Sequence, residues 1–140
     1  MNISSLNVLF LFFIIVMEER IKESITRQCK AIFPGTLNAN ETLFGGQAMQ
    51  WMDEVAYITA TRFTRKKMFT VSTDNIKFLK TVSPGMFAEI VGNVEKVGSV
   101  KLHVKIEIWA EEMYGTERYK AIEGTFIFAS LDENLKPQRL

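Results

Sequence analysis

The stretch from Gln47 to Thr61, QAMQWMDEVAYITAT, constrains the fold of this chain more than any other segment. It contains neither glycine nor proline, and its apolar residues cover nearly every side of the helix that it predicts. A helix that is apolar on all sides is buried inside a protein rather than laid on its surface. The remainder of the chain must therefore supply a layer that covers this helix.

Four strand-like segments follow the helix, at residues 69–79, 86–97, 100–108 and 119–130. The third alternates apolar with polar residues, which is the pattern of a strand with one solvated face. The connections are short, and strands joined by short turns are antiparallel neighbours. Because neither the helix nor the sheet can bury its apolar face alone, the sequence predicts an α+β roll, in which a curved antiparallel sheet wraps around one long helix.

An unbroken apolar run from Val8 to Met17 precedes this domain. It is shorter than the roughly 20 residues of a membrane-spanning helix, and its first basic residue, Arg20, follows the run instead of preceding it as in a secretory signal. We therefore expect no stable membrane insertion, and we divide the chain into an N-terminal extension, residues 1–17, and a domain, residues 18–137. Three explanations of the extension stay open: translation from Met17, a weak membrane-associating tail, or an additional buried segment.

Composition excludes several classes of function. A formal net charge of +1 provides no concentrated basic surface for nucleic acid. One histidine, His103, and one cysteine, Cys29, are too few for a zinc cluster, and no GxSxG-type turn accompanies the histidine. We predict no metal and no cofactor. A single cysteine cannot form an internal disulfide, which favours a cytoplasmic location.

Two features around the predicted helix carry candidate chemistry. Asp53 and Glu54 lie among apolar residues, and burial of an unpaired carboxylate is costly, so a functional carboxylate competes with a narrow solvated stripe as the explanation. Gly45 and Gly46 precede the helix without a capping side chain. Either they form a plain tight turn, or the free amide N–H groups at this positive helix end polarise a carbonyl oxygen.

Gly46 and Asp53 share one face of the predicted helix but lie about 10 Å apart along its axis. A reacting carbonyl group lies about 3 Å from both its hydrogen-bond donors and the attacking group. One helix therefore cannot easily provide both, whereas two antiparallel helices related by a two-fold axis can.

The segment from Asn38 to Ala56, NANETLFGGQAMQWMDEVA, resembles the signature of the acyl-CoA hydrolase family of hotdog-fold proteins. That family includes the cytosolic and the brown-fat-inducible acyl-CoA thioesterases, and weaker similarity extends the resemblance over about residues 18–137. The resemblance implies a hotdog fold and the hydrolysis of acyl-CoA to CoA and a carboxylic acid. The alternative is a non-catalytic hotdog domain that binds acyl-CoA as a sensor.

The resemblance also implies roles for individual residues. Asp53 would be the catalytic carboxylate, as general base or nucleophile, and Asn38 would hold the thioester or the water from the opposite subunit. The oxyanion and substrate-binding site would be formed by Gly45, Gly46 and Gln47. The protein would be a homo-oligomer, either a dimer or a trimer of dimers, with active sites at its subunit interfaces.

Basic residues follow the helix at Arg62, Arg65 and Lys66. They are expected either to bind the phosphates of CoA or to complement the negative C-terminus of the helix.

The sequence departs from the family pattern in two places. Glu41 stands where the family usually has a glycine, and Val100 and Lys101 replace a usual Thr-Ser pair. Neither departure changes Asp53 or the two glycines, but both are expected to affect the finer contacts with the substrate.

Overall fold

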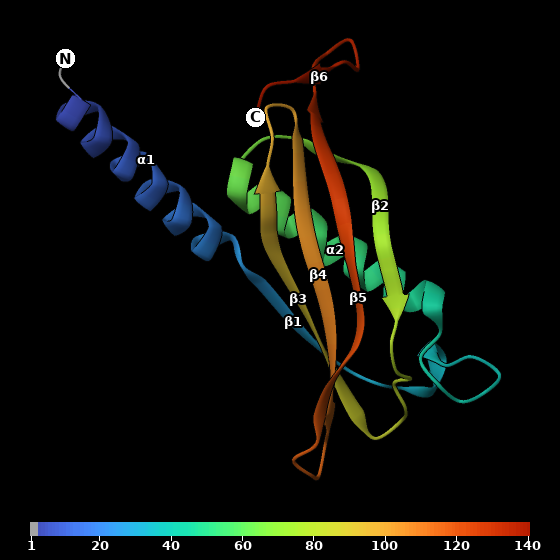
Figure 1. Cartoon of the computed structure of the whole chain (residues 1–140). Coiled ribbons are helices and arrows are strands. Elements are labelled where there is room, and N and C mark those ends of the chain that lie inside the picture. The colour runs from blue at the N-terminus through green and yellow to red at the C-terminus, as the bar shows by residue number, and fades with distance from the viewer. Residues whose placement is uncertain (1–2) are drawn as a thin grey trace.

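The computed structural model describes residues 3–140 as a curved antiparallel sheet, a long helix against it and a second, projecting helix (Figure 1). The helices are α1 (Ile3–Ser24) and α2 (Gly45–Thr64), with a 3-10 turn, η1 (Pro34–Thr36), between them. The strands are β1 (Thr26–Ala31), β2 (Met68–Phe78), β3 (Met86–Val97), β4 (Lys101–Glu112), β5 (Arg118–Leu131) and β6 (Pro137–Gln138).

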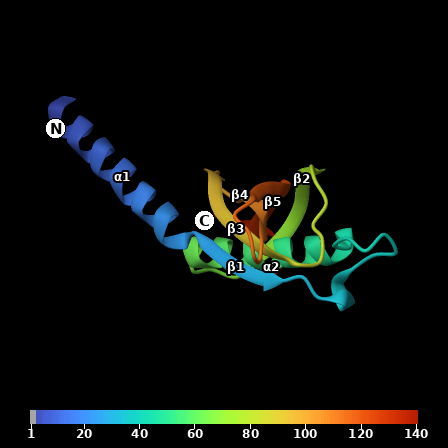
Figure 2. The same cartoon turned by 90° about the horizontal axis from the view of Figure 1, so that it is seen from below.

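The strand order is β1-β3-β4-β5-β2, with the short β6 added to β5, and all pairings are antiparallel. Seen from below, the sheet arches over α2 (Figure 2). The predicted α+β roll is confirmed. The alternation expected for residues 100–108 is also confirmed, since every second residue of β4 from Leu102 to Ala110 is fully buried.

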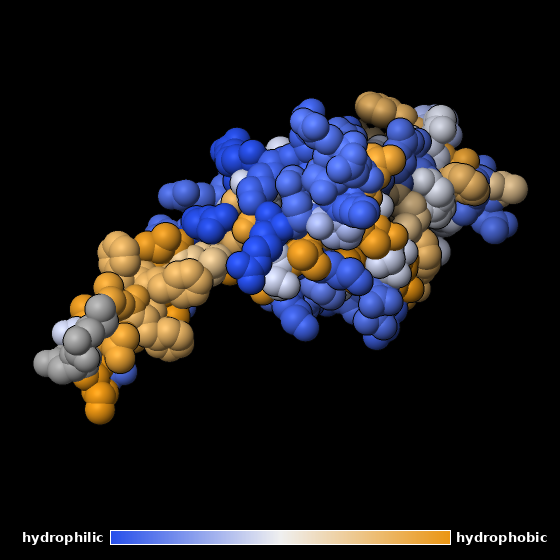
Figure 3. All heavy atoms as spheres, turned by 90° about the horizontal axis from the view of Figure 1, so that it is seen from above, coloured by the Kyte–Doolittle hydropathy of each residue, from blue (hydrophilic) through white to orange (hydrophobic). Residues whose placement is uncertain are grey.

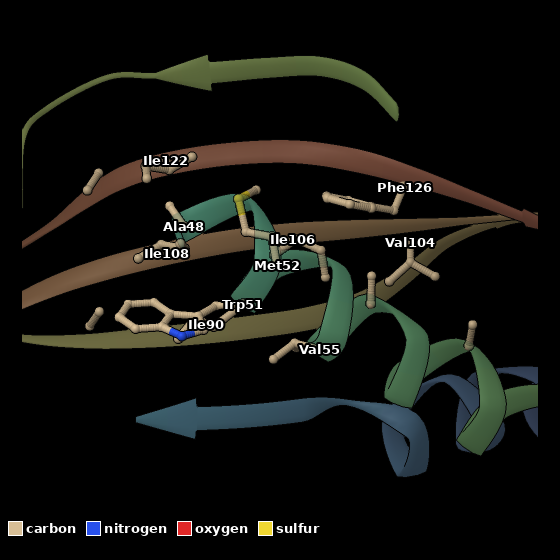
Figure 4. Close-up of a cluster of buried hydrophobic side chains, with 14 of the residues drawn as sticks. Ala48, Trp51, Met52, Val55, Ile90, Val104, Ile106, Ile108, Ile122 and Phe126 are labelled. Atoms are coloured by element: carbon tan, nitrogen blue, oxygen red, sulfur yellow. The ribbon is translucent and has the colours of Figure 1, made fainter. Parts of the chain in front are cut away.

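The core lies between α2 and the concave face of the sheet (Figure 4). Met52 and Val55 of α2 are fully buried there, as are Ile90 and Ile106 of the sheet. The two layers lie close together at Gly92, where a β-carbon would overlap the hydroxyl of Thr59 and lie 3.1 Å from Val55. A larger residue at position 92 would therefore push against α2.

The predicted element boundaries hold within a few residues. The segment predicted at residues 86–97 coincides with β3, whereas α2 begins at Gly45, so both glycines lie in its first turn and do not precede it. The polar tail from Asp132 turns back to form β6 against β5. The four predicted strands therefore correspond to β2, β3, β4 and β5, whereas β1 and the short β6 lie outside them.

The prediction that α2 is apolar and buried on all sides was wrong. Gln50, Asp53 and Glu54 are exposed, and Tyr57 is 48% exposed. These residues form a continuous exposed stripe, because positions three and four apart share one face of a helix. Asp53 and Glu54 are therefore solvated in the single chain, as the explanation of this acidic pair by a narrow solvated stripe expects.

Helix α1 continues without a break through residue 17, so the expected division of the chain lies inside a helix. Its N-terminal part projects from the body as a rod with an apolar surface (Figure 3). Only its C-terminal part packs on the core, through Met17 and Ile21. Within the single chain, the run is therefore not a buried segment. Within residues 3–140, no helix is both long and apolar enough to cross a membrane.

Candidate active site

Asp53 lies on the exposed stripe of α2, on the side that faces the edge strand β2. The Thr70 hydroxyl donates a hydrogen bond of 2.9 Å to Asp53 Oδ1. This bond holds one carboxylate oxygen and leaves Oδ2 open to solvent or substrate. Thr70 is thus a further candidate site residue, which was not predicted from the sequence.

The neighbourhood of Asp53 is a shallow, open cleft of about 320 Å³, lined by Gly46, Met49, Gln50, Asp53, Thr70, Thr73 and Phe126. Gly46 and Asp53 thus share a face of α2, as their spacing predicted. Thr70 and Thr73 both line the cleft although strict alternation would place them on opposite faces of a strand. The β2–β5 register shifts between Thr70 and Ser72, which brings the two hydroxyls to one side.

The N-terminus of α2 points unpaired amide groups outward. Phe44 precedes the helix in an extended conformation, and its side chain provides no capping hydrogen bond. The first bond of the helix is donated by Ala48 to the Phe44 carbonyl, at 3.0 Å. Within residues 3–140, the amides of Gly45, Gly46 and Gln47 donate to no backbone acceptor outside the helix. The uncapped helix end therefore has the donors that an oxyanion site requires.

Asn38 belongs to a different part of the surface. It lines a second cavity of about 320 Å³ with Gly45, Phe78 and seven further residues, none of which lines the Asp53 cleft. A single chain therefore brings Asn38 to one side of the α2 N-terminus and Asp53 to the other. The structure does not bring together the two predicted catalytic residues within one chain.

The Asn38 side chain is occupied by its own loop. Its Oδ1 accepts hydrogen bonds from the amides of Asn40, at 2.9 Å, and Thr42, at 3.2 Å, while Nδ2 donates to the Thr42 hydroxyl at 3.0 Å. Glu41 closes this turn in the left-handed region, with φ of 59°. A glycine adopts that conformation without strain, which explains why the family pattern has one here.

The basic residues after α2 serve the chain's own structure. Arg62 donates to the carbonyls of Glu23, at 2.5 Å, and Ile25, at 2.7 Å, so it caps the end of α1 rather than that of α2. Arg65 ends α2 in the left-handed region, and Lys66 donates to the Arg139 carbonyl at 2.9 Å. None of the three lines the Asp53 cleft or the Asn38 cavity.

A separate cluster of charges lies on the outer face of β1, β3 and β5. Glu89 accepts from Arg118 at 2.8 Å and lies 3.3 Å from Arg27. The Arg118 hydrogen bond lowers the pKa of Glu89. The free thiol of Cys29 lies 3.8 Å from the same carboxylate, and burial first and Glu89 second raise the pKa of this thiol.

Residues 40–116 match the thioesterase superfamily. The chain belongs to this superfamily. The similarity to a named relative supports the assignment: a Buchnera aphidicola protein named as an acyl-CoA thioester hydrolase is 34% identical over 110 residues, which are 76% of this chain and 82% of the relative. The predicted family and the predicted enzyme class are confirmed.

Solved thioesterases share the fold of this one. The Staphylococcus aureus acyl-CoA hydrolase, determined in complex with butyryl-CoA, CoA and CoA disulfide, superposes with a TM-score of 0.79 at 29% identity, over 85% of this chain and 73% of that one. The hexameric thioesterase of Yersinia pestis gives a TM-score of 0.73 at 30% identity, over 81% and 92% of the two chains. The predicted hotdog fold is confirmed.

Three variants of the S. aureus thioesterase have also been solved, in which an asparagine, an aspartate or a threonine is replaced by alanine.

Proposed function

We propose that this thioesterase hydrolyses acyl-CoA to CoA and a carboxylic acid, with Asp53 as general base in a site completed by a second chain. The observation that carries the proposal is the open cleft in which Asp53, oriented by Thr70, shares a surface with the uncapped N-terminus of α2. The relatives named for acyl-CoA support the substrate class.

The hydrogen bond from Thr70 supports the role of Asp53 as a base. With Oδ1 held by Thr70, Oδ2 accepts a proton from water as the water oxygen attacks the thioester carbonyl carbon. The carbon–sulfur bond then breaks, and the CoA thiolate takes up the proton. The asparagine, aspartate and threonine replaced in the S. aureus variants have the same spacing along that chain as Asn38, Asp53 and Thr70 have here.

The N-terminus of α2 supports a role in oxyanion stabilisation. The amides of Gly45, Gly46 and Gln47 lie at the positive end of a 20-residue helix, where they favour negative charge on the carbonyl oxygen. A β-carbon at Gly46 would lie 2.7 Å from the Phe44 ring. A glycine therefore lets the ring and a substrate both approach the backbone.

Two chains complete each site in this proposal. Asn38 and Asp53 open on different sides of α2, so an antiparallel partner helix would bring Asn38 and the glycines of one chain to Asp53 of the other. The exposed stripe of α2 and the edge strand β2 are the surfaces available for this contact. Phe69 and Val71 of β2 are 43% and 51% exposed, and an exposed apolar edge strand is a surface that proteins normally cover.

We propose a dimer built on these surfaces, and three such dimers in the full assembly, for which the hexameric relative is the precedent. We also propose a cytoplasmic location, in keeping with the single free thiol of Cys29. Binding of CoA phosphates by Arg62, Arg65 and Lys66 stays a proposal, in which Arg62 and Lys66 would have to exchange the hydrogen bonds that they donate to carbonyl groups of their own chain.

Turnover tests the proposal directly. The purified chain is incubated with short-, medium- and long-chain acyl-CoA, and released CoA is measured with a thiol reagent. We expect saturable release with at least one chain length. Tight binding of acyl-CoA without release of CoA would favour the alternative function, a non-catalytic acyl-CoA sensor. The absence of both binding and release would contradict both functions.

A further inference from the structure

The N-terminal part of α1 is apolar in every direction. Val8, Leu9, Phe10 and Leu11 are 65%, 54%, 64% and 58% exposed. Neighbouring residues of a helix point about 100° apart, so these four consecutive side chains span its full circumference. The same composition continues without a polar residue to Val16. None of these residues contributes to the cleft around Asp53.

The distribution of apolar side chains around α1 indicates which kind of surrounding covers this helix. A helix that packs on one protein surface carries a single apolar stripe and a polar opposite face, as α2 does. Residues 8–16 have no polar face to turn towards water. A surrounding that is apolar on all sides, such as the hydrocarbon of a lipid bilayer, fits this helix better than the face of a protein partner.

The length and flanks of the segment define how it would enter lipid. Residues 8–16 extend about 14 Å, roughly half the hydrocarbon thickness of a bilayer. Ser5 and Asn7 lie beyond the apolar run at the tip, so an oblique helix within one leaflet lets them reach the head groups. Glu18, Glu19 and Glu23 at the base of the run outnumber Arg20 and Lys22, so this part of the helix has no net positive charge that would favour anionic lipid.

The base of α1 is fixed to the body. Arg20 donates to the Phe63 carbonyl at 2.9 Å, and its guanidinium group lies 4.4 Å from the centre of the Phe63 ring. Met17 and Ile21 pack on the core beside it. The exposed part of α1 therefore extends outward from a base that is attached to the rest of the domain (Figures 1 and 3).

Although the short length of the apolar run led us to expect no stable membrane insertion, we propose that residues 8–16 insert obliquely into one leaflet of a lipid bilayer and hold the thioesterase at the membrane surface without crossing the membrane. This would place hydrolysis beside the bilayer, where long-chain acyl groups and the fatty acids released from them partition.

The test is flotation of the full chain with phosphatidylcholine vesicles. We expect the chain to float with the vesicles, and Phe12→Ser to weaken its partition about tenfold, since one phenylalanine is withdrawn from hydrocarbon. Phe33→Ser is the matched control, because Phe33 and Phe12 are both 66% exposed but Phe33 lies on the body. Its partition should equal that of the unchanged chain. Thioesterase activity and circular dichroism establish that both variants are folded.

Hydrogen exchange of residues 8–16 supplies the second measurement. Protection that appears only when vesicles are added supports insertion. Protection without vesicles that is lost on dilution would mean that a second copy of the chain covers the helix, and would overturn the proposal. Equal flotation of the Phe12→Ser and Phe33→Ser variants, or binding only to anionic vesicles, would also overturn it.

Discussion

Asp53 is the residue on which the proposed chemistry depends. Replacement by asparagine keeps the size of the side chain and its hydrogen bond with Thr70, but it removes the base. We expect the Asp53→Asn variant to lose about 10²–10⁴-fold in kcat, as is typical when a general base is removed. Its melting temperature should stay close to that of the unchanged chain, because Asp53 is exposed and contributes nothing to the core.

Glu54→Gln is the matched control for this variant. Glu54 is an exposed carboxylate one position along the same helix, but it does not line the cleft. Its replacement should leave kcat within a few-fold. If both variants lose activity equally, the charge of the helix and not the base accounts for the loss.

Cys29 provides a test of the electrostatics on the outer face of the sheet. Its thiol pKa is raised by burial and then by Glu89, so the reactive thiolate forms only at higher pH than in a free cysteine. We expect alkylation by iodoacetamide at about pH 8 to be slower than for a free cysteine. Glu89→Gln should move the rate profile to lower pH, without restoring it fully because burial remains.

Glu111→Gln is the comparison for this experiment, since Glu111 affects the Cys29 pKa less than Glu89 does. It should produce the smaller shift in the rate profile. A larger shift for Glu111→Gln than for Glu89→Gln would contradict the assignment of causes.

Some site residues could be predicted from the sequence and others could not. Asp53 and Gly46 share a helical face, which follows from their spacing in any regular helix. Thr70 escaped prediction because it meets Asp53 across 17 positions of the chain, and a contact between a strand and a helix has no local signature in the sequence. Arg62 was assigned to CoA or to the end of α2, whereas it reaches the end of α1, a long-range contact without any local pattern.

At the scale of the element, the backbone of the loop from Asn38 to Thr42 is strained at one residue, and the effect of this strain on stability can be measured. Glu41 occupies the left-handed region, where a side chain costs roughly 1 kcal/mol relative to glycine. We expect Glu41→Gly to raise the melting temperature by a few degrees, in line with that energy. Calorimetry of the two proteins measures the difference.

The control within the same loop is Ala39→Gly. Ala39 is exposed but is not among the residues with positive φ, so a glycine there only adds freedom to the unfolded chain. This variant should be less stable than the unchanged chain. Stabilisation by both substitutions would show that loop flexibility, and not the φ of Glu41, is responsible.

The elements themselves were largely predictable, because alternation along β4 and the absence of helix breakers in α2 are local properties. The exposed face of α2 was not predicted. Met49 and Tyr57 look like core residues in the sequence, yet they lie towards the surface that we propose a second chain covers. A sequence records that a residue is apolar, but not whether its own chain or another one buries it.

At the scale of the whole molecule, a shared site predicts complementation between inactive chains. The Asn38→Ala and Asp53→Ala variants should each be nearly inactive. In a mixed dimer one site would receive both changes and the other neither. Refolded together in equal amounts, they form about half heterodimers, so roughly a quarter of all sites should be intact.

Activity of the mixture is compared with that of each variant refolded alone, and subunit exchange is verified by mass spectrometry. Exchange without recovered activity would mean that Asn38 and Asp53 act within one chain, or that Asn38 only shapes its loop.

The domain should fold and work without the N-terminal part of α1. A chain that begins at Met17 keeps Arg20 and Ile21, which attach α1 to the body. We expect it to be soluble and to have the kcat of the full chain. An insoluble or inactive product would mean that residues 1–16 belong to the folding unit.

The contact at Gly92 makes this enzyme sensitive to a substitution that lies outside the candidate active site. Helix α2 rests there directly on the sheet, through Thr59 and Val55, and Asp53 lies near that support on the opposite side of the helix. A single methyl group at position 92 would overlap the Thr59 hydroxyl, so that either this side chain or the helix that carries Asp53 would have to shift. A Gly92→Ala substitution would thus keep every candidate site residue and still disturb the packing that supports them, so the sequence of the motif alone does not guarantee its geometry.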